Sequence, residues 1–279
     1  IMFLGFLTMK FLRMITKHFL FFVTHIFFVL QKKFYLIINK GKLDHDVDND
    51  KLIELVKELQ KNGFVVIKDF FDKDKVESMC KYFYEELETK EKDFFAYLDR
   101  NKVALDKLKE QNINYKKKVN YAIYGSEKEE DSSYFFNIIA KFKIFDTYNT
   151  KFLQSLLTMY LNYFPKLTSG NLRISFSNSE PASDTQLFHR DASGYKFLKC
   201  FVYLHDVDKE HGPLTYIKSS HKDLLKFKDD LKLRYDDNEI IERYSEKSVT
   251  YLTAKKTDLI IADTSGFHKG SKNIKERVM

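Results

Sequence analysis

The chain has 279 residues, of which 44% are hydrophobic, enough to bury the core of one large domain or two small ones. Its formal net charge of +7 is concentrated in residues 1–46, with seven Lys/Arg and two Asp; the rest carries 40 basic and 38 acidic residues, so nucleic acid is not expected as a partner. Cys80 and Cys200 match no disulfide framework or metal-site spacing, which favours a reducing compartment, the cytoplasm.

The first 46 residues form a hydrophobic and basic extension. Phe19–Leu30 contains no Lys, Arg, Asp or Glu, and Lys17 and Lys32 flank it. The run is shorter than the roughly 20 apolar residues that a spanning helix needs. We interpret residues 1–46 as a leader upstream of the true start or as a loosely packed helix, with a membrane anchor through residues 1–38 as the alternative.

An ordered domain is expected over residues 47–279. It begins with a helix over residues 48–63, because apolar residues recur at helical spacing and Gly63 stands where a C-terminal cap belongs. Phe64–Ile67 then predicts a short strand. The apolar residues of the helix are Leu52, Ile53, Val56 and Leu59.

A second helix is predicted to begin at Asp74, which forms a capping box with Glu77. Its apolar positions are Val76, Met79, Tyr82, Phe83 and Leu87. Residues 88–115 are rich in interspersed Lys, Asp and Glu, and predict a solvated helical face or a mobile insert.

Residues 133–165 carry aromatic and aliphatic residues at helical intervals up to Pro165, and predict helices that pack against a barrel. The barrel strands are expected to begin at about Leu172, where apolar and polar residues alternate as far as Ser177. Residues 178–184 are expected to form a loop.

His189 and Asp191 follow this loop and are separated only by Arg190. In a strand, side chains two residues apart project from the same face, so both can point at one ion. With His268, which would come from a later strand, they make up two imidazoles and a carboxylate. This is the ligand set of the facial triad that holds non-haem Fe(II).

Three other histidines are not expected to bind metal. His205 and His211 flank an acidic turn and are expected to be exposed to solvent. His221 stands at an expected helix start, where capping or packing is the commoner role.

Several segments occur together and in order: residues 62–71 (NGFVVIKDFF), 187–191 (LFHRD), 203–213 (YLHDVDKEHGP), 219–222 (SSHK) and 258–270 (DLIIADTSGFHKG). Over residues 47–279 the chain thereby resembles the phytanoyl-CoA dioxygenase family of Fe(II)- and 2-oxoglutarate-dependent oxygenases. The resemblance implies a mainly β fold with flanking helices, with a double-stranded β-helix (jelly-roll, cupin-like) core. It also implies Fe(II), with 2-oxoglutarate and O2 as cosubstrates.

Arg277 stands where the family has an arginine that binds the far carboxylate of 2-oxoglutarate. A planar guanidinium suits this role, because it pairs with a carboxylate through two hydrogen bonds and keeps its charge when partly buried. Gly270 has no hydroxyl to help hold the cosubstrate. Family members usually continue beyond the position of Met279, so a truncated pocket is a further expectation.

The predicted activity is hydroxylation of an unactivated C–H bond of a small molecule, with release of succinate and CO2. Related halogenases lack the carboxylate ligand, so Asp191 favours hydroxylation. The alternatives are a cupin-like metal-dependent hydrolase or isomerase and a non-catalytic jelly-roll binding module. Tyr195, Phe197 and Lys199 are candidates for a substrate pocket, with an ordinary place in the sheet as the alternative. Substrate identity and oligomeric state do not follow from the sequence.

Overall fold

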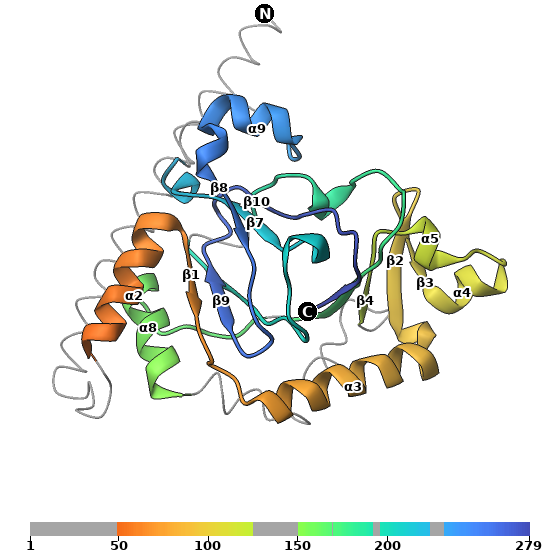
Figure 1. The fold of residues 1–279 in the computed structure, drawn as a ribbon, viewed down its shortest axis with the longest axis horizontal. Coiled ribbons are helices and arrows are strands. Elements are labelled where there is room, and N and C mark those ends of the chain that lie inside the picture. The colour runs from red at the N-terminus through yellow and green to blue at the C-terminus, as the bar shows by residue number, and fades with distance from the viewer. Residues whose placement is uncertain (1–48, 125–149, 169, 192–195, 224–231) are drawn as a thin grey trace, which may run out of the picture.

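The computed structural model describes residues 49–124, 150–168, 170–191, 196–223 and 232–279. The expected N-terminal extension, Tyr195 and much of the stretch 133–165 lie outside these residues. The described chain is mainly β with flanking helices, in three antiparallel sheets that form a jelly-roll core, as the sequence predicts (Figure 1). No helix among the described residues is long and apolar enough to cross a membrane.

The helices are α2 (Asn49–Asn62), α3 (Lys73–Thr89), α4 (Leu105–Glu110), α5 (Tyr115–Lys118), α8 (Lys151–Leu161) and α9 (Asp237–Tyr244). The strands are β1 (Phe64–Ile67), β2 (Phe94–Leu98), β3 (Asn101–Ala104), β4 (Tyr121–Tyr124), β5 (Leu172–Ser175), β6 (Lys199–Phe201), β7 (Leu214–Ile217), β8 (Val249–Leu252), β9 (Leu259–Ala262), β10 (His268–Gly270) and β11 (Arg277–Val278).

The first sheet has the order β1-β9-β6, and its central strand β9 is buried on both faces. One face of β9 carries Leu259 and Ile261, which pack with α2 and α8; Figure 1 shows both helices beside β1. The other face carries Ile260 and Ala262, which pack against strands β7 and β8 of the β10-β7-β8 sheet. Because successive side chains of β9 point to opposite faces, this one strand contributes to two hydrophobic cores. The predicted first helix and the strand after it are confirmed as α2 and β1.

The third sheet, of order β10-β7-β8, lies over this second core. Leu214, Tyr216 and Leu252 meet Phe64 and Ile260 there. The edge strand of this sheet is β10, which begins with His268. One of the three expected metal ligands is therefore part of a strand in a packed sheet.

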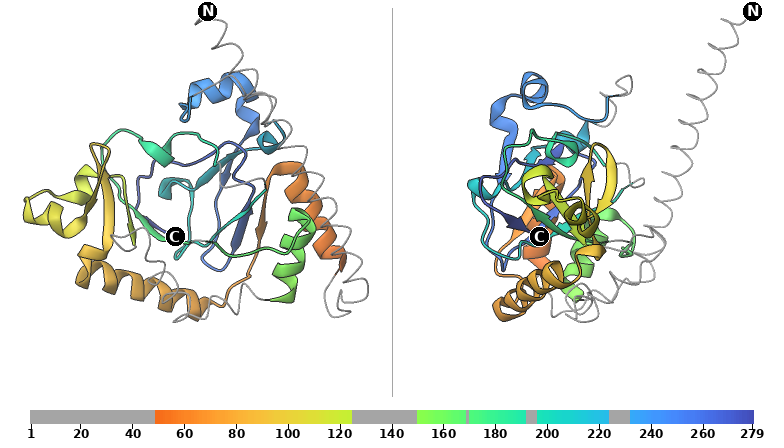
Figure 2. Two further views of the ribbon diagram at one scale, coloured as in Figure 1. Left: turned by 180° about the vertical axis from the view of Figure 1, so that it is seen from behind. Right: turned by 90° about the vertical axis from the view of Figure 1, so that its right-hand side faces the viewer.

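The remaining sheet has the order β11-β5-β4-β2-β3, with α3 against one of its faces. Figure 2 shows this sheet and α3 from two further sides. The prediction for residues 88–115 is wrong: they form β2, β3 and α4, and they bury Phe94, Phe95, Ala96, Leu105 and Leu108. Their charged side chains lie on the outer surface of a folded hairpin and helix. The many charged residues therefore masked the pattern of buried positions in the sequence.

Smaller predictions are corrected at element ends. Helix α3 is capped by Asp72, whose side chain accepts a hydrogen bond from Lys75 N, and not by a capping box that begins at Asp74. Helix α8 ends at Leu161, where Asn162 adopts the left-handed conformation, four residues before Pro165. Regular strand in the run 197–204 is limited to β6.

Candidate metal centre

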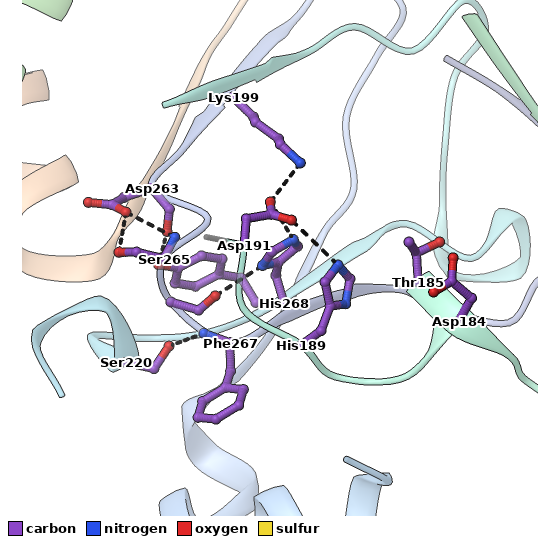
Figure 3. A network of polar contacts seen from close by, with 12 residues as sticks. Asp184, Thr185, His189, Asp191, Lys199, Ser220, Asp263, Ser265, Phe267 and His268 are labelled. Atoms are coloured by element: carbon purple, nitrogen blue, oxygen red, sulfur yellow. Dashed lines mark hydrogen bonds and ion pairs between the residues drawn. The ribbon is translucent and has the colours of Figure 1, made fainter. Parts of the chain in front are cut away.

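His189, Asp191 and His268 converge in the structure. Each offers one ligand atom, and these atoms all lie within 4.8 Å of one another (Figure 3). His268 Nε2 lies 3.4 Å from Asp191 Oδ2, and His189 Nε2 lies 4.0 Å from Asp191 Oδ1. Both histidines are buried, at 5% and 4% exposure, and Asp191 is partly buried.

Backbone pairing between distant segments produces this convergence. His189 and His268 form an antiparallel bridge, with each amide N donating to the other residue's carbonyl O at 3.0 Å. Asp191 N donates to Thr264 O at 2.9 Å, which fixes the second member of the pair against the turn before His268. His189 and Asp191 are not in a regular strand, but the same-face relation expected of a strand is kept.

Each imidazole is oriented by the backbone two residues before it. His189 Nδ1 lies 2.9 Å from Leu187 O, and His268 Nδ1 lies 3.0 Å from Gly266 O. A carbonyl can only accept, so in a neutral ring the proton belongs on Nδ1 and Nε2 is left with its lone pair. Both Nε2 atoms are therefore prepared as metal ligands, in the way that second-shell hydrogen bonds prepare them in metal sites.

The charges also suit a cation. Burial, followed by the proximity of His268, lowers the pKa of His189 to about 4, so its ring is neutral near pH 7 and needs no deprotonation to bind metal. Burial alone would raise the pKa of Asp191, but His268 and Lys199 outweigh it and hold that pKa well below its usual range. Two imidazoles and a carboxylate fit Fe(II) in donor type and number.

Lys199, a candidate for the substrate pocket, lies against the third ligand. Its Nζ is 2.6 Å from Asp191 Oδ2 (Figure 3), and its side chain is 44% exposed. Phe197 is half-buried.

Arg277 is on β11, as expected for the strand after the distal histidine. Its side chain is 3% exposed, and its only hydrogen bond to a described residue runs from Nη2 to Ser175 Oγ at 3.2 Å. Nε and Nη1 are buried without hydrogen-bond partners, and no carboxylate of the described chain pairs with the group. Burial lowers the pKa of Arg277 to about 10, so it remains a cation near neutral pH. A Cβ at position 270 would lie 3.0 Å from Nη2, so Gly270 leaves room for this guanidinium.

The other three histidines are outside the cluster. His205 and His211 are not exposed as expected: they are half-buried, their ring centroids lie 5.1 Å apart, and His205 Nε2 accepts a hydrogen bond from Val278 N. His221 is in a short 3-10 turn, Ser220–Lys222, and its Nε2 lies 3.1 Å from Gln60 O. Each is used in packing or in backbone hydrogen bonds.

Arg173 is a polar residue near the centre that the sequence did not single out. It is on β5, where alternation with Leu172 and Ile174 indicated the solvent side of a half-buried strand. In the structure, that polar side faces the interior of the molecule. Alternation of polar and apolar residues indicates that a strand has two different faces, but the packing of the second layer of the barrel determines which face is exposed to solvent.

Comparisons with known proteins agree with this arrangement. The family model for Phytanoyl-CoA dioxygenase (PhyH) matches residues 59–277. No curated protein matches the chain. A solved structure of the epimerase SnoN, in complex with Fe3+, alpha ketoglutarate and nogalamycin RO, superposes with a TM-score of 0.53 at 15% identity, over 83% of this chain and 82% of that one.

Two further solved structures are similar. HygX from Streptomyces hygroscopicus, with nickel and 2-oxoglutarate bound, has a TM-score of 0.47 at 16% identity, over 81% of this chain and 83% of that one. EctD from S. alaskensis, with bound Fe, has a TM-score of 0.46 at 13% identity, over 84% and 76%. The likeness to SnoN indicates a shared fold, while the family match extends over most of the sequence. The chain belongs to the phytanoyl-CoA dioxygenase (PhyH) family.

Proposed function

We propose that this chain is an Fe(II)- and 2-oxoglutarate-dependent oxygenase that hydroxylates an unactivated C–H bond of a small molecule, with release of succinate and CO2. The observation that carries the proposal is the convergence of His189, Asp191 and His268 around one point, in a chain of this family. His189 and His268 would bind the metal through Nε2, and Asp191 through its carboxylate. The bound metal, with 2-oxoglutarate and O2, supplies the oxidising power that breaks the C–H bond.

The protein's share is binding and orientation. The carbonyls of Leu187 and Gly266 hold the two rings in place, so the ligands need little reorganisation when the metal binds. Burial of both histidines keeps water away from the reacting groups. Arg277 would bind the distal carboxylate of 2-oxoglutarate through its unpartnered nitrogens, with Ser175 Oγ holding Nη2.

A hydrolase or isomerase with Zn(II) at the same three ligands is the competing activity. It gives no role to Arg277, whose buried charge lacks a counter-ion among the described residues. A buried cation without an anion is costly, and a carboxylate of the cosubstrate would remove that cost. This favours the oxygenase. SnoN, which shares the fold, is an epimerase, so the fold alone does not determine the product of the reaction, and the product is identified by experiment.

The decisive test is anaerobic titration with Fe(II) and 2-oxoglutarate, monitored through the weak visible charge-transfer band of the chelate. We expect the band in the wild type and its loss in His268→Ala. The matched control is His211→Ala, which removes a half-buried histidine that pairs with Asp208 away from the centre. It should keep the band.

Turnover is then measured as succinate release in air with candidate substrates. We expect release with the wild type and with His211→Ala, and none with Asp191→Ala or His268→Ala. Mass spectrometry should find one oxygen atom added to the substrate. Absence of the band in the wild type, or full succinate release by His268→Ala, would refute the proposal; substrate hydrolysis with Zn(II) alone would favour the competing activity.

A further inference from the structure

The face of the five-stranded sheet that points away from α3 carries two arginines. Arg277 on β11 lies opposite Ser175 on β5, and Arg173 is two residues before Ser175 on the same strand. Residues directly opposite each other, and residues two apart, project from one face. Ile174 and Val278 project from the other face, into the core beneath α3. Both guanidiniums therefore share the face that does not contact this core.

The guanidinium of Arg173 is held in a fixed position. Its Cζ lies 4.5 Å from the centroid of the Tyr121 ring, and Nη1 donates to Thr185 Oγ1 at 3.0 Å. The ring contact occupies one face of the guanidinium plane, and the hydrogen bond occupies Nη1. Nε is shielded from solvent and has no hydrogen-bond partner, and Nη2 donates to none of the described residues. The Nε–Nη2 edge thus makes no hydrogen bond to the described residues, and it is one of the two edges that bind a carboxylate through parallel hydrogen bonds.

Arg173 also lacks a paired counter-ion among the described residues. Asp184, one residue before Thr185, already accepts hydrogen bonds from Tyr121 Oη at 2.5 Å and Arg234 Nη2 at 2.8 Å. Burial lowers the pKa of Arg173, and the charges of Asp184 and Asp191 act against this. The group is therefore a cation whose desolvation is compensated only from a distance.

Its position is next to the metal centre. Thr185 is in the turn Asp184–Gln186, which ends three residues before His189 (Figure 3 labels both), and Arg173 lies close enough to Asp191 for that carboxylate to act against the lowering of its pKa. On the other side, the sheet face continues through Ile123, opposite Arg173, to Phe95 on β2, and then along that strand to Tyr97, which is 49% exposed. Arg173 thus lies between the ligand set and a part of the face that reaches solvent.

Two buried guanidiniums without a directly paired anion among the described residues call for two anionic groups. The distal carboxylate of 2-oxoglutarate would neutralise one of them, Arg277, and its other carboxylate belongs at the metal. A second anion is then needed for Arg173. We propose that Arg173 binds a carboxylate of the substrate, so that the enzyme acts on a small carboxylic acid whose acidic end is anchored beside the turn that leads to His189. This inference rests on the proposed function.

The test uses the enzyme loaded anaerobically with Fe(II) and 2-oxoglutarate. The probes are short aliphatic carboxylic acids, each paired with its primary amide. Binding is measured by calorimetry and by perturbation of the charge-transfer band. We expect the wild type to bind at least one acid about tenfold or more tightly than its amide, as a charge-assisted bidentate contact implies.

Arg173→Gln should abolish this preference for the acid, and Arg173→Lys, which keeps the charge but not the fork, should retain part of it. Arg234→Gln is the matched control, because it removes another guanidinium that binds Asp184, and it should keep the wild-type preference. Both Arg173 variants should bind Fe(II) and 2-oxoglutarate with wild-type affinity.

The outcomes separate this inference from the proposed function. Loss of the charge-transfer band in the wild type would refute the proposed function itself. A normal band, combined with no acid binding or with equal binding of acids and amides, would overturn the role of Arg173 alone. An Arg173→Gln variant that keeps the preference, or that loses affinity for 2-oxoglutarate instead, would also overturn it.

Discussion

At the scale of single residues, the centre depends on one device used twice. Both histidines place Nδ1 on the carbonyl of the residue two positions earlier, Leu187 O for His189 and Gly266 O for His268. Because the partner is so close in sequence, the local backbone conformation determines the direction of each ring. A ligand set of this kind is largely formed before the metal arrives, which limits the conformational entropy lost on binding.

A single substitution at Arg277 is predicted to have opposite effects on the stability of the ligand-free protein and on its affinity for 2-oxoglutarate. Arg277→Met replaces a buried, uncompensated cation with an apolar side chain of similar length. We expect the ligand-free variant to be at least as stable as the wild type, since the desolvation cost is removed. Affinity for 2-oxoglutarate should fall by about 10- to 100-fold, because charge-assisted hydrogen bonds of about 1.5–3 kcal/mol are lost. Thermal unfolding with and without 2-oxoglutarate measures both effects.

Arg243→Met is the control for Arg277→Met, because Arg243 is exposed and lies over the Tyr235 ring. It should leave the stabilisation by 2-oxoglutarate unchanged. A marked fall in the melting temperature of ligand-free Arg277→Met, with 2-oxoglutarate binding intact, would show that the guanidinium is structural.

At the scale of elements, the connection between β9 and β10 positions His268. Asp263 accepts hydrogen bonds from Tyr160 Oη at 2.6 Å and from Ser265 N at 3.1 Å, which ties the connection to α8. Tyr216 Oη donates to Asp263 O at 2.7 Å and lies against Gly266, where a Cβ would come within 2.0 Å of it. The connection can follow this path only because position 266 has no side chain.

Gly266→Ala should therefore weaken the metal site. Tyr216 is fully buried and cannot move aside, so the backbone at position 266 must shift, and with it the carbonyl that holds His268 Nδ1. Disturbing such a second-shell contact commonly costs 10- to 100-fold in metal affinity. We expect a loss of about this size in Fe(II) titration. Ser265→Ala, one residue earlier, removes a hydroxyl without adding bulk and should have a smaller effect; equal affinity in Gly266→Ala and the wild type would contradict this reasoning.

The elements also show what the sequence could and could not predict. Helix α2 and strand β1 were predictable because their apolar spacing reports burial directly, and Gly63, at φ +89°, ends the helix as expected. The triad could be located because the HxD spacing and a histidine late in the chain can be recognised in the sequence without knowledge of the barrel. The hairpin of β2 and β3 was missed, because the surrounding residues 88–115 are rich in charged side chains and its pairing partner β4 comes later in the chain.

Arg173 was missed for a related reason. Its strand, β5, pairs with β4 on one side and with β11 on the other, and these partners come from widely separated parts of the chain. Only their assembly determines that the polar face of β5 looks inward. Lys199 was named from the sequence as a candidate for the substrate pocket, but its contact with Asp191 follows only from the assembled fold.

At the scale of the whole molecule, the centre joins segments that are distant in the chain. His268 belongs to the third sheet, and Asp191 pairs through its backbone with the turn that leaves the first sheet. A ligand that binds only the folded state stabilises it in proportion to the logarithm of its concentration over Kd, by about 2.7 kcal/mol at 100 times Kd. Fe(II) should therefore raise the melting temperature of the entire described fold and not of one sheet.

The metal-free protein should lose stability as pH falls from about 6.5 to 4. In this window an unfolded histidine binds a proton, while folded His189, with a pKa lowered to about 4, does not. The unfolded state then holds more protons than the folded state. The free energy of unfolding therefore decreases as the pH decreases, by up to about 3 kcal/mol for this residue. Asp191 acts in the same direction at lower pH, because its lowered pKa stabilises the fold only while the unfolded carboxyl is also ionised.

Urea denaturation of the metal-free protein at a series of pH values measures this slope. His189→Gln should flatten it, because glutamine does not titrate, whereas the lowered pKa values of His205 and His221 leave a residual slope. The matched control is His211→Gln, which changes a half-buried histidine outside the ligand set. A stability that stays constant or rises between pH 6.5 and 4 would mean that His189 accepts a proton in the folded state, and the ring would then not be prepared to receive a metal.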